Sequence, residues 1–130
     1  MGFPVASRIL TVDDMATMRK IIKSLLNQLG YTNIDEAENG KEALAKLKQS
    51  KYDLVLLDWN MPEMDGITLL QEIRKDTHLK DIPVIMVTAE AKKENVLIAI
   101  QSGANNYIVK PFTAETLKEK LEKVWQQING

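Results

Sequence analysis

A run of four apolar residues, 54–57 (Leu-Val-Leu-Leu), leads directly into a carboxylate at Asp58, and this stretch limits the fold more than any other. A short continuous apolar run followed by turn residues predicts a strand that is buried on both faces. Such strands lie in the middle of parallel sheets, whose carboxyl ends open on the crevice where α/β proteins bind ligands. We therefore expect Asp58 at the mouth of a site. The alternative is a loop carboxylate that caps the next helix, since Pro62 and Gly66 open a loop.

The rest of the chain alternates between short apolar runs and segments in which apolar residues recur at helical spacing. The apolar runs predict strands at residues 8–12, 33–37, 54–57, 83–88 and 106–109, the second of which is weak and is expected near an edge. The helical spacing predicts helices at residues 15–29, 40–49, 66–75, 92–102 and from 114 onward. Alternation of this kind is typical of βαβ units, so we predict one three-layer α/β domain with a parallel sheet.

Capping signals stand at the ends of the predicted helices. One aspartate of the pair Asp13-Asp14 is expected to cap the first helix, and Gly30 is expected to stop it. That leaves the second aspartate for another role. The apolar stripe of this helix is expected to comprise Met15, Met18, Ile22, Leu25 and Leu29. In the last helix, a cap at Thr113 precedes a shared face of Leu117, Leu121, Val124 and Ile128.

Composition excludes several classes of function. The 130 residues suit one domain, and 17 basic against 18 acidic residues argue against a dedicated nucleic-acid binder. The absence of cysteine excludes a thiolate nucleophile and a cysteine-ligated metal. No apolar run approaches the roughly 20 residues that span a bilayer, so membrane insertion is not expected. We interpret residues 1–7 as a short, loose N-terminal lead-in, because they lack a signal peptide's basic start and apolar block.

Polar side chains follow four of the predicted strands. Asp13 and Asp14 follow the first strand, Asp58 the third, Thr88 the fourth and Lys110 the fifth. Because parallel strands end at the same edge of a sheet, these side chains converge if the strands are neighbours. Taken singly, each has a structural alternative: Thr88 suits a helix cap, and Lys110 suits a solvated charge.

Carboxylates gathered in this way repel one another. At about 4 Å and an effective dielectric of about 20, each like-charged pair costs roughly 4 kcal/mol, which raised pKa values or a cation must offset. Oxygen ligands without His or Cys favour a hard ion, and Mg²⁺ is the first choice. The implied chemistry is an aspartyl phosphate, in which the carboxylate is the nucleophile and the cation and Lys110 stabilise charge.

Several motifs together resemble the receiver domains of two-component response regulators, and among these the stand-alone chemotaxis regulators. The motifs are Asp13-Asp14, Asp58-Trp59-Asn60, Met61-Pro62-x-Met64-Asp65-Gly66, Thr88-Ala89, residues 89–95 and Tyr107-x-Val109-Lys110-Pro111-Phe112-Thr113. The resemblance covers residues 8–130, which we take as one receiver domain, although Thr11 and Asn105-Asn106 are more polar than the family pattern. It implies a single doubly wound (βα)5 flavodoxin-like domain, with a five-stranded parallel sheet in the order 2-1-3-4-5 and helices on both faces.

The resemblance also implies roles for individual residues in the chemistry. Asp58 would accept the phosphoryl group, while Thr88 and Lys110 would hold its oxygens. One Mg²⁺ per domain would bind Asp58, Asp14, the backbone carbonyl of Asn60 and, through water, Asp13. The bond between Lys110 and Pro111 would be cis, which is accessible because the following residue is proline.

Other implied roles concern signalling. Thr88 and Tyr107 would form a switch pair that remodels the face formed by the fourth helix, fifth strand and fifth helix. Asn60 and Glu90 would tune the lifetime of the phosphate. The partner face would include Lys93, Val96, Tyr107 and Lys120. Val96 is equally well explained as a core residue, and the lysines as solvated charges.

The resemblance implies a cytoplasmic, monomeric signalling switch that is not an enzyme beyond assisting its own phosphorylation and dephosphorylation. A histidine kinase would supply the phosphoryl group, the flagellar motor switch protein would be the target, and an auxiliary phosphatase is a further candidate partner. One alternative is a phosphorelay intermediate that passes phosphate to a histidine phosphotransfer protein. Another is an aspartyl phosphatase of the haloacid dehalogenase type, which requires a second aspartate where this chain has Asn60.

Overall fold

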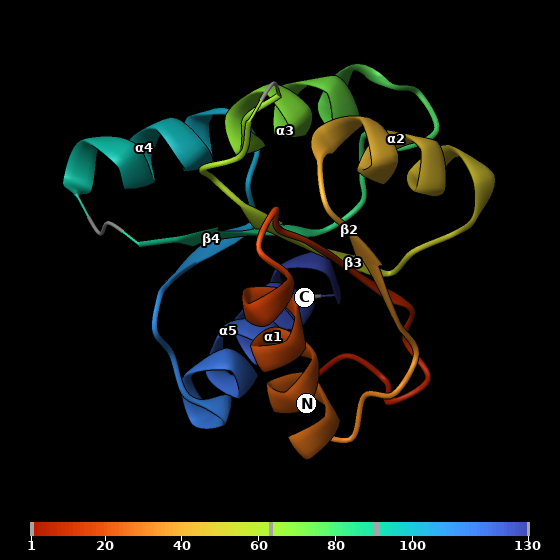
Figure 1. Ribbon diagram of the computed structural model, residues 1–130, viewed down its shortest axis with the longest axis vertical. Helices are drawn as coiled ribbons and strands as arrows, with labels where there is room; N and C mark the ends of the chain where they lie inside the picture. The colour runs from red at the N-terminus through yellow and green to blue at the C-terminus, as the bar shows by residue number, and fades with distance from the viewer. Residues whose placement is uncertain (1, 63, 90–91, 130) are drawn as a thin grey trace.

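Strands and helices alternate along the whole chain (Figure 1). The computed structural model describes residues 2–62, 64–89 and 92–129. The strands are β1 (Ile9–Val12), β2 (Ile34–Ala37), β3 (Leu54–Asp58), β4 (Val84–Thr88) and β5 (Asn106–Val109). The helices are α1 (Ala16–Gln28), α2 (Gly40–Gln49), α3 (Gly66–Lys75), α4 (Lys93–Gln101) and α5 (Ala114–Asn129). Each strand and helix predicted from the sequence is confirmed, with small differences at its ends.

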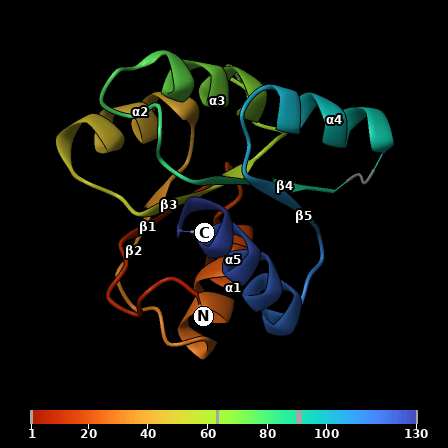
Figure 2. The same ribbon diagram turned by 180° about the vertical axis from the view of Figure 1, so that it is seen from behind.

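The strands form one parallel sheet in the order β2-β1-β3-β4-β5, as the resemblance implies. The predicted edge position of β2 is also confirmed. Helices α2, α3 and α4 cover one face of the sheet, and α1 and α5 cover the other (Figures 1 and 2). The flavodoxin-like (βα)5 architecture predicted for the chain is therefore present.

The core lies in two layers, one on each face of the sheet. Alternate residues of β3 serve the two layers: Val55 and Leu57 pack with α2 and α3, whereas Leu54 and Leu56 pack with α1 and α5. All four side chains are at most 1% exposed, which explains the continuous apolar run that predicted this strand. Burial of such side chains contributes roughly 1.5–3 kcal/mol each, so β3 anchors the middle of the sheet.

Most of the predicted helix ends agree with the structure. Thr113 Oγ1 accepts the Thr116 N–H at 3.2 Å, which confirms the cap of α5. Gly30 and Gly103 adopt φ values of +100° and +107° after α1 and α4, a conformation that glycine adopts without strain. The aspartate cap predicted for α1 is wrong, because Met15 occupies the N-cap position and Asp13 bonds the Met15 N–H instead.

The apolar stripe predicted for α1 is partly wrong. Met15 is 60% exposed because it precedes the first turn of the helix. Ile22 and Leu26 are the fully buried residues of α1, and Leu26 was not among those predicted. In α5 the predicted face is buried at Leu117, Leu121 and Val124, but Ile128 near the end is 44% exposed.

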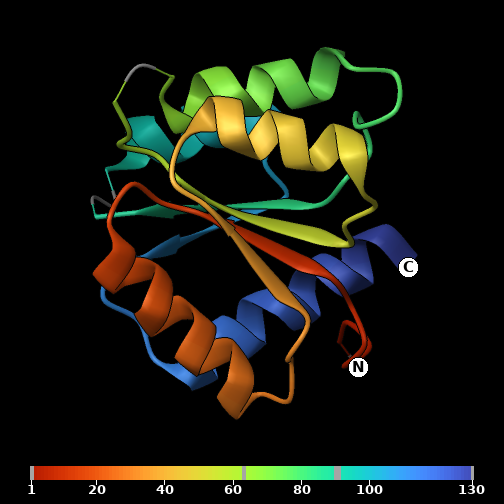
Figure 3. The ribbon, with the colours of Figure 1, turned by 45° about the vertical axis from the view of Figure 1, so that its right-hand side comes forward.

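The N-terminal lead-in was expected to be loose, but it packs against the domain. Phe3 is 5% exposed, and its ring meets the Trp125 ring of α5 edge-on at 5.2 Å between centroids. The Phe3 carbonyl accepts the Tyr31 hydroxyl at 2.7 Å, which ties the lead-in to the connection after α1. Figure 3 shows both termini on the right, and the β1 end that leads into α1 on the left. Among the residues that the structure describes, no helix is long and apolar enough to span a bilayer.

Candidate functional site

Strands β1 and β3 bring three carboxylates together at one edge of the sheet. Val12, the last residue of β1, pairs with Leu57, so Asp13 and Asp14 emerge beside Asp58. One ligand oxygen from each of Asp13, Asp14 and Asp58 lies within 4.8 Å of the other two. The convergence that the strand ends predict is confirmed for these three residues.

Asp13 is held rigidly within this cluster. Its side chain is fully buried, and its backbone N–H continues the β1–β2 pairing by donating to the Ala37 carbonyl at 3.1 Å. Its Oδ1 accepts the Met15 N–H at 2.9 Å, and its Oδ2 accepts from Lys110 Nζ at 3.3 Å. Asp14 is exposed. The pair therefore offers one fixed carboxylate and one that solvent reaches.

Lys110 follows β5 and extends over the cluster. Its Nζ lies 2.9 Å from Asp58 Oδ1, and the side chain is only 18% exposed. Its backbone N–H donates to the Thr88 carbonyl at 2.7 Å, which anchors the lysine beside the end of β4. The bond between Lys110 and Pro111 is cis, as the resemblance implies. The lysine is thus placed to balance the charge of Asp58 and Asp13.

The electrostatics of the cluster favour a bound cation. Burial raises the pKa of the Asp58 carboxyl, the contact with Lys110 opposes this rise, and the charges of Asp13 and Asp14 add to it. Burial lowers the pKa of Lys110, but its contacts with Asp58 and Asp13 outweigh burial, and the net pKa is raised. Lys110 is therefore protonated at neutral pH, and one lysine faces three carboxylates. A further cation would relieve the remaining repulsion.

The donor set fits Mg²⁺. Among the described residues, Asp13, Asp14 and Asp58 form the one group of acidic, His or Cys side chains close enough to hold a metal ion. All three supply oxygen, and Mg²⁺ prefers carboxylate oxygens together with several waters. Asn60 lies in the loop just after β3 and is exposed. The arrangement suits a cation that is open to solvent on one side.

The loop after β3 is folded tightly against the strand that carries Asp58. The Gly66 N–H donates to the Trp59 carbonyl at 2.8 Å, and Trp59 packs partly buried on the core. A Cβ at Gly66 would lie 2.4 Å from the Asp58 carbonyl oxygen, closer than any side chain tolerates. Glycine at this position therefore lets the loop close beneath Asp58 and places Trp59 as a neighbour of the cluster.

The predicted switch residues lie at and beside the site. Thr88 is buried at the end of β4, where it pairs in register with Val109 of β5. Tyr107 lies on β5 and is half-buried. Lys120 Nζ of α5 lies 4.5 Å from the centre of the Tyr107 ring, a cation–π contact.

The remaining predicted residues lie on or near α4. Lys93 begins this helix and is exposed, and Val96 is half-buried. Helix α4 also exposes three large apolar side chains: Leu97, Ile98 and Ile100. Figure 2 shows α4, β5 and α5 along one side of the molecule. Glu90 lies outside the described residues.

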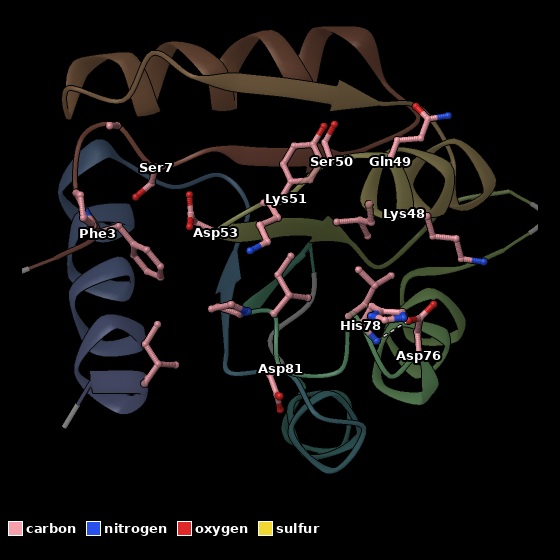
Figure 4. Close-up of a pocket in the computed structure, with 18 of the residues that line it drawn as sticks. Phe3, Ser7, Lys48, Gln49, Ser50, Lys51, Asp53, Asp76, His78 and Asp81 are labelled. Carbon is pink, nitrogen blue, oxygen red and sulfur yellow. Dashed lines mark hydrogen bonds between the residues drawn. The ribbon is translucent and has the colours of Figure 1, made fainter.

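A hollow of about 1040 Å³ lies at the opposite end of the sheet (Figure 4). It is lined by the lead-in, the connections before β3 and β4, and the end of α5. Two of its three acidic side chains are already bonded: Asp53 accepts the Arg8 N–H, and Asp76 accepts the His78 N–H, each at 2.8 Å. The acidic cluster lies at the carboxyl ends of the strands and not in this hollow, so the size of a hollow does not by itself identify the functional site.

Comparison with known protein families identifies the family of the chain. Residues 9–122 match the response regulator receiver domain. The chain belongs to this family. The receiver domain is 54% identical to the chemotaxis protein CheY of Pseudomonas aeruginosa, over 95% of this chain and 99% of that protein. It is 55% identical to the chemotaxis protein CheY-3 of Vibrio cholerae, over 93% of each.

Solved structures agree with this assignment. The chemotaxis protein CheY4 of Vibrio cholerae superposes with a TM-score of 0.85 at 34% identity, covering 92% of this chain and 98% of that one. The receiver domain of a sensor histidine kinase from Pseudomonas aeruginosa, solved with a magnesium ion in its active-site cleft, gives 0.82 at 30% identity, covering 92% and 97%. The receiver domain is therefore of the CheY-like chemotaxis type, a family of signalling switches.

The sequence did not reveal one residue that touches the acidic turn. Arg19, in the first turn of α1, donates from Nη1 to the Asp13 carbonyl at 2.6 Å. An arginine five residues after the acidic pair was the available signal. The direction of its side chain depends on β2, which helical periodicity does not describe.

Proposed function

We propose that this receiver domain is a phosphorylation-dependent switch of a chemotaxis two-component pathway, in which Asp58 accepts a phosphoryl group from a histidine kinase. The observation that supports this function best is the meeting of Asp13, Asp14 and Asp58 within 4.8 Å, with Lys110 2.9 Å from Asp58. The relatives named chemotaxis proteins support the pathway. We place the reaction in the cytoplasm.

The transfer uses Asp58 as the nucleophile. One carboxylate oxygen of Asp58 bonds to the phosphorus of a phosphohistidine. The P–N bond breaks, and its electron pair stays with an imidazole that carries a proton on its other nitrogen. The Lys110 ammonium, beside Asp58, stabilises the negative charge on the phosphoryl oxygens, and the Thr88 hydroxyl holds one of these oxygens.

One Mg²⁺ would be held by Asp13, Asp14, Asp58 and the Asn60 carbonyl. When bound, the ion supplies positive charge to the phosphoryl oxygens. The chain's own contribution is to fix the carboxylates, since Asp13 is buried and bonded from several directions. A receiver domain of 30% identity that holds magnesium in its cleft supports this assignment.

Phosphorylation would change the face formed by α4, β5 and α5. Thr88 moves toward the phosphoryl group, and Tyr107 turns inward into the space beside β4. The inward turn breaks the 4.5 Å contact between Tyr107 and Lys120, so the charge and shape of the face change together. A protein target such as the flagellar motor switch then binds this face, which also carries Lys93 and Val96. Asn60 and Glu90 would set the lifetime of the phosphate.

Tryptophan fluorescence tests the site. The chain has two tryptophans, so Trp125→Phe leaves Trp59, which lies beside Asp58, as the reporter. We expect Mg²⁺ to quench Trp59 emission, and acetyl phosphate or beryllofluoride to change it further. Asp58→Asn should abolish the second change while the circular dichroism spectrum stays native. A full response to phosphodonor in Asp58→Asn would remove Asp58 from its role.

A binding experiment tests the output. The purified chain is passed over immobilised motor switch protein with Mg²⁺, with and without beryllofluoride. We expect retention to rise with beryllofluoride in the wild type and to stay low in Asp58→Asn and in Tyr107→Ala. Transfer of labelled phosphate from the chain to a histidine phosphotransfer protein, without retention on the motor protein, would favour the phosphorelay alternative. An added auxiliary phosphatase should shorten the lifetime of the same label.

A further inference from the structure

We propose that Arg19 is a positioning residue of the acidic site, whose guanidinium holds the Asp13-Asp14 peptide in the orientation that binds a divalent cation. This inference rests on the proposed function and deepens it. Arg19 lies in the first turn of α1, and its side chain is only 14% exposed. A long cationic side chain that is this buried needs specific partners.

Two contacts fix the direction of the guanidinium. Nη1 donates to the backbone carbonyl of Asp13 at 2.6 Å, and Nε donates to Glu36 Oε1 at 3.0 Å. Because the N–H bonds of a guanidinium lie in its plane, two hydrogen bonds from different nitrogens restrain the orientation of the whole group. Arg19 therefore joins three elements: α1, the turn after β1, and β2.

The anchor at Glu36 is itself fixed. Glu36 lies in β2 and pairs in register with Thr11 of β1. Lys46 of α2 donates to the Glu36 carbonyl and pairs with Glu42 at 3.2 Å. Since α1 and α2 lie on opposite faces of the sheet, this end of β2 is held from both sides (Figure 1). Arg19 therefore connects the acidic turn to a rigid point.

The bond to the Asp13 carbonyl reaches both aspartates at once. That carbonyl belongs to the planar peptide unit that joins Asp13 to Asp14, so its orientation sets the directions in which both side chains leave the backbone. The carboxylates must stay within 4.8 Å of one another to share one ion. Lys110 contacts the carboxylates themselves, whereas the Arg19 contacts leave every carboxylate oxygen of the cluster available.

Charge and geometry predict opposite effects of replacing Arg19, which makes the proposal testable. If Arg19 acted only as a nearby positive charge, Arg19→Gln would strengthen Mg²⁺ binding and Arg19→Lys would leave it unchanged. If Arg19 positions the turn, both variants weaken binding, because neither side chain spans the Asp13 carbonyl and Glu36 with a planar fork. Loss of partners that orient metal ligands typically weakens affinity about tenfold or more.

The experiment titrates Mg²⁺ against Trp59 emission in the Trp125→Phe background, well below the melting temperature of each variant. We expect the dissociation constant to rise about tenfold in Arg19→Lys and Arg19→Gln. Glu36→Gln retains the bond from Arg19 to Asp13 and should show a smaller rise. Arg8→Gln is the matched control, since Arg8 bridges the other end of the same strands to Asp35 at 2.9 Å. It should lower the melting temperature and leave Mg²⁺ affinity unchanged.

Each outcome decides between the possibilities. The positioning role would be overturned if both Arg19 variants bound Mg²⁺ within twofold of wild type, or if Arg19→Gln bound it more tightly. Either result would leave the proposed function intact. An equal loss in Arg8→Gln would show that the effect is one of general stability, and would also overturn the positioning role. Failure of the wild type itself to respond to Mg²⁺ would instead contradict the proposed function. If an Arg19 variant fails to fold, Glu36→Gln carries the test against the Arg8 control.

Discussion

Ionisation of Asp58 destabilises the folded protein, because burial raises the pKa of its carboxyl. The folded state then holds the proton more tightly than the unfolded state, so stability falls as the pH rises from the ordinary value of 3.8 through the raised folded pKa. At neutral pH and without divalent cations, we expect Asp58→Asn to increase the free energy of unfolding by about 1 kcal/mol. Urea denaturation in the presence of a chelator measures this change.

The same experiment contains its own controls. The difference between Asp58→Asn and wild type should shrink as the pH falls below 3.8, where the wild-type carboxyl is protonated in both states. Saturating Mg²⁺ should stabilise the wild type, by about 2.7 kcal/mol at a hundred times the dissociation constant, and should stabilise the variant less. A variant that is less stable than wild type in chelator at neutral pH would contradict the expected sign.

Thr11 places a polar group in the core without an evident partner. Its side chain is fully buried in β1, and its Oγ1 has no hydrogen-bond partner among the described residues. A buried hydroxyl without a partner costs roughly 1–3 kcal/mol, and valine has nearly the same shape. We therefore expect Thr11→Val to raise the free energy of unfolding by about 1 kcal/mol in urea denaturation. Thr11→Ser, which keeps the hydroxyl and loses a methyl group, should be less stable than wild type.

At the scale of elements, Arg74 joins α3 to the turn after α4. Its Nε and Nη2 donate to the Gly103 carbonyl at 3.0 and 2.8 Å, and Nη1 donates to the Ile82 carbonyl at 2.7 Å. Arg74→Lys cannot satisfy these carbonyls together, so we expect it to lower the free energy of unfolding by about 2–4 kcal/mol. Thermal and urea denaturation measure the loss. Lys75→Gln, on the exposed side of the same helix, should change stability by less than about 0.5 kcal/mol.

Elements were predictable where local pattern determines them. The apolar run before Asp58 predicted a buried central strand, and Thr113 predicted the start of α5. The orientation of α1 was predicted less well, because the side of a helix that meets the sheet depends on where its first turn begins. Met15 precedes that turn and is exposed, while Leu26 is fully buried.

Contacts between elements that are far apart in the sequence could not be predicted from local sequence pattern. The sequence placed the three aspartates and Lys110 at strand ends, and the parallel sheet then brought them together. It did not show that Arg19 turns toward β2, since that direction depends on Glu36 in another strand. The family resemblance supplied the strand order, which composition and periodicity leave open.

At the scale of the whole molecule, the lead-in is expected to contribute to stability and not to the site. The Phe3 ring packs on Trp125 and its carbonyl accepts the Tyr31 hydroxyl; Phe3 lines the hollow beside the connections before β3 and β4, whereas Asp58 ends β3. We expect Phe3→Ala to lower the free energy of unfolding by about 1–3 kcal/mol, because the lead-in can detach without global unfolding. In a Trp59→Phe background, Trp125 emission should shift to longer wavelength, while Mg²⁺ affinity read from Trp59 in the Trp125→Phe background should not change. A weaker Mg²⁺ affinity would mean that the two ends communicate.

The docked lead-in also has a practical use. It keeps residue 2 beside the last turns of α5, so an anchor attached near either terminus holds the protein by the same end. Molecules tethered to a sensor chip in this way would stand in one common orientation, with the aspartates turned toward the flowing solution. Kinase and metal ion would then reach every copy without obstruction from the support.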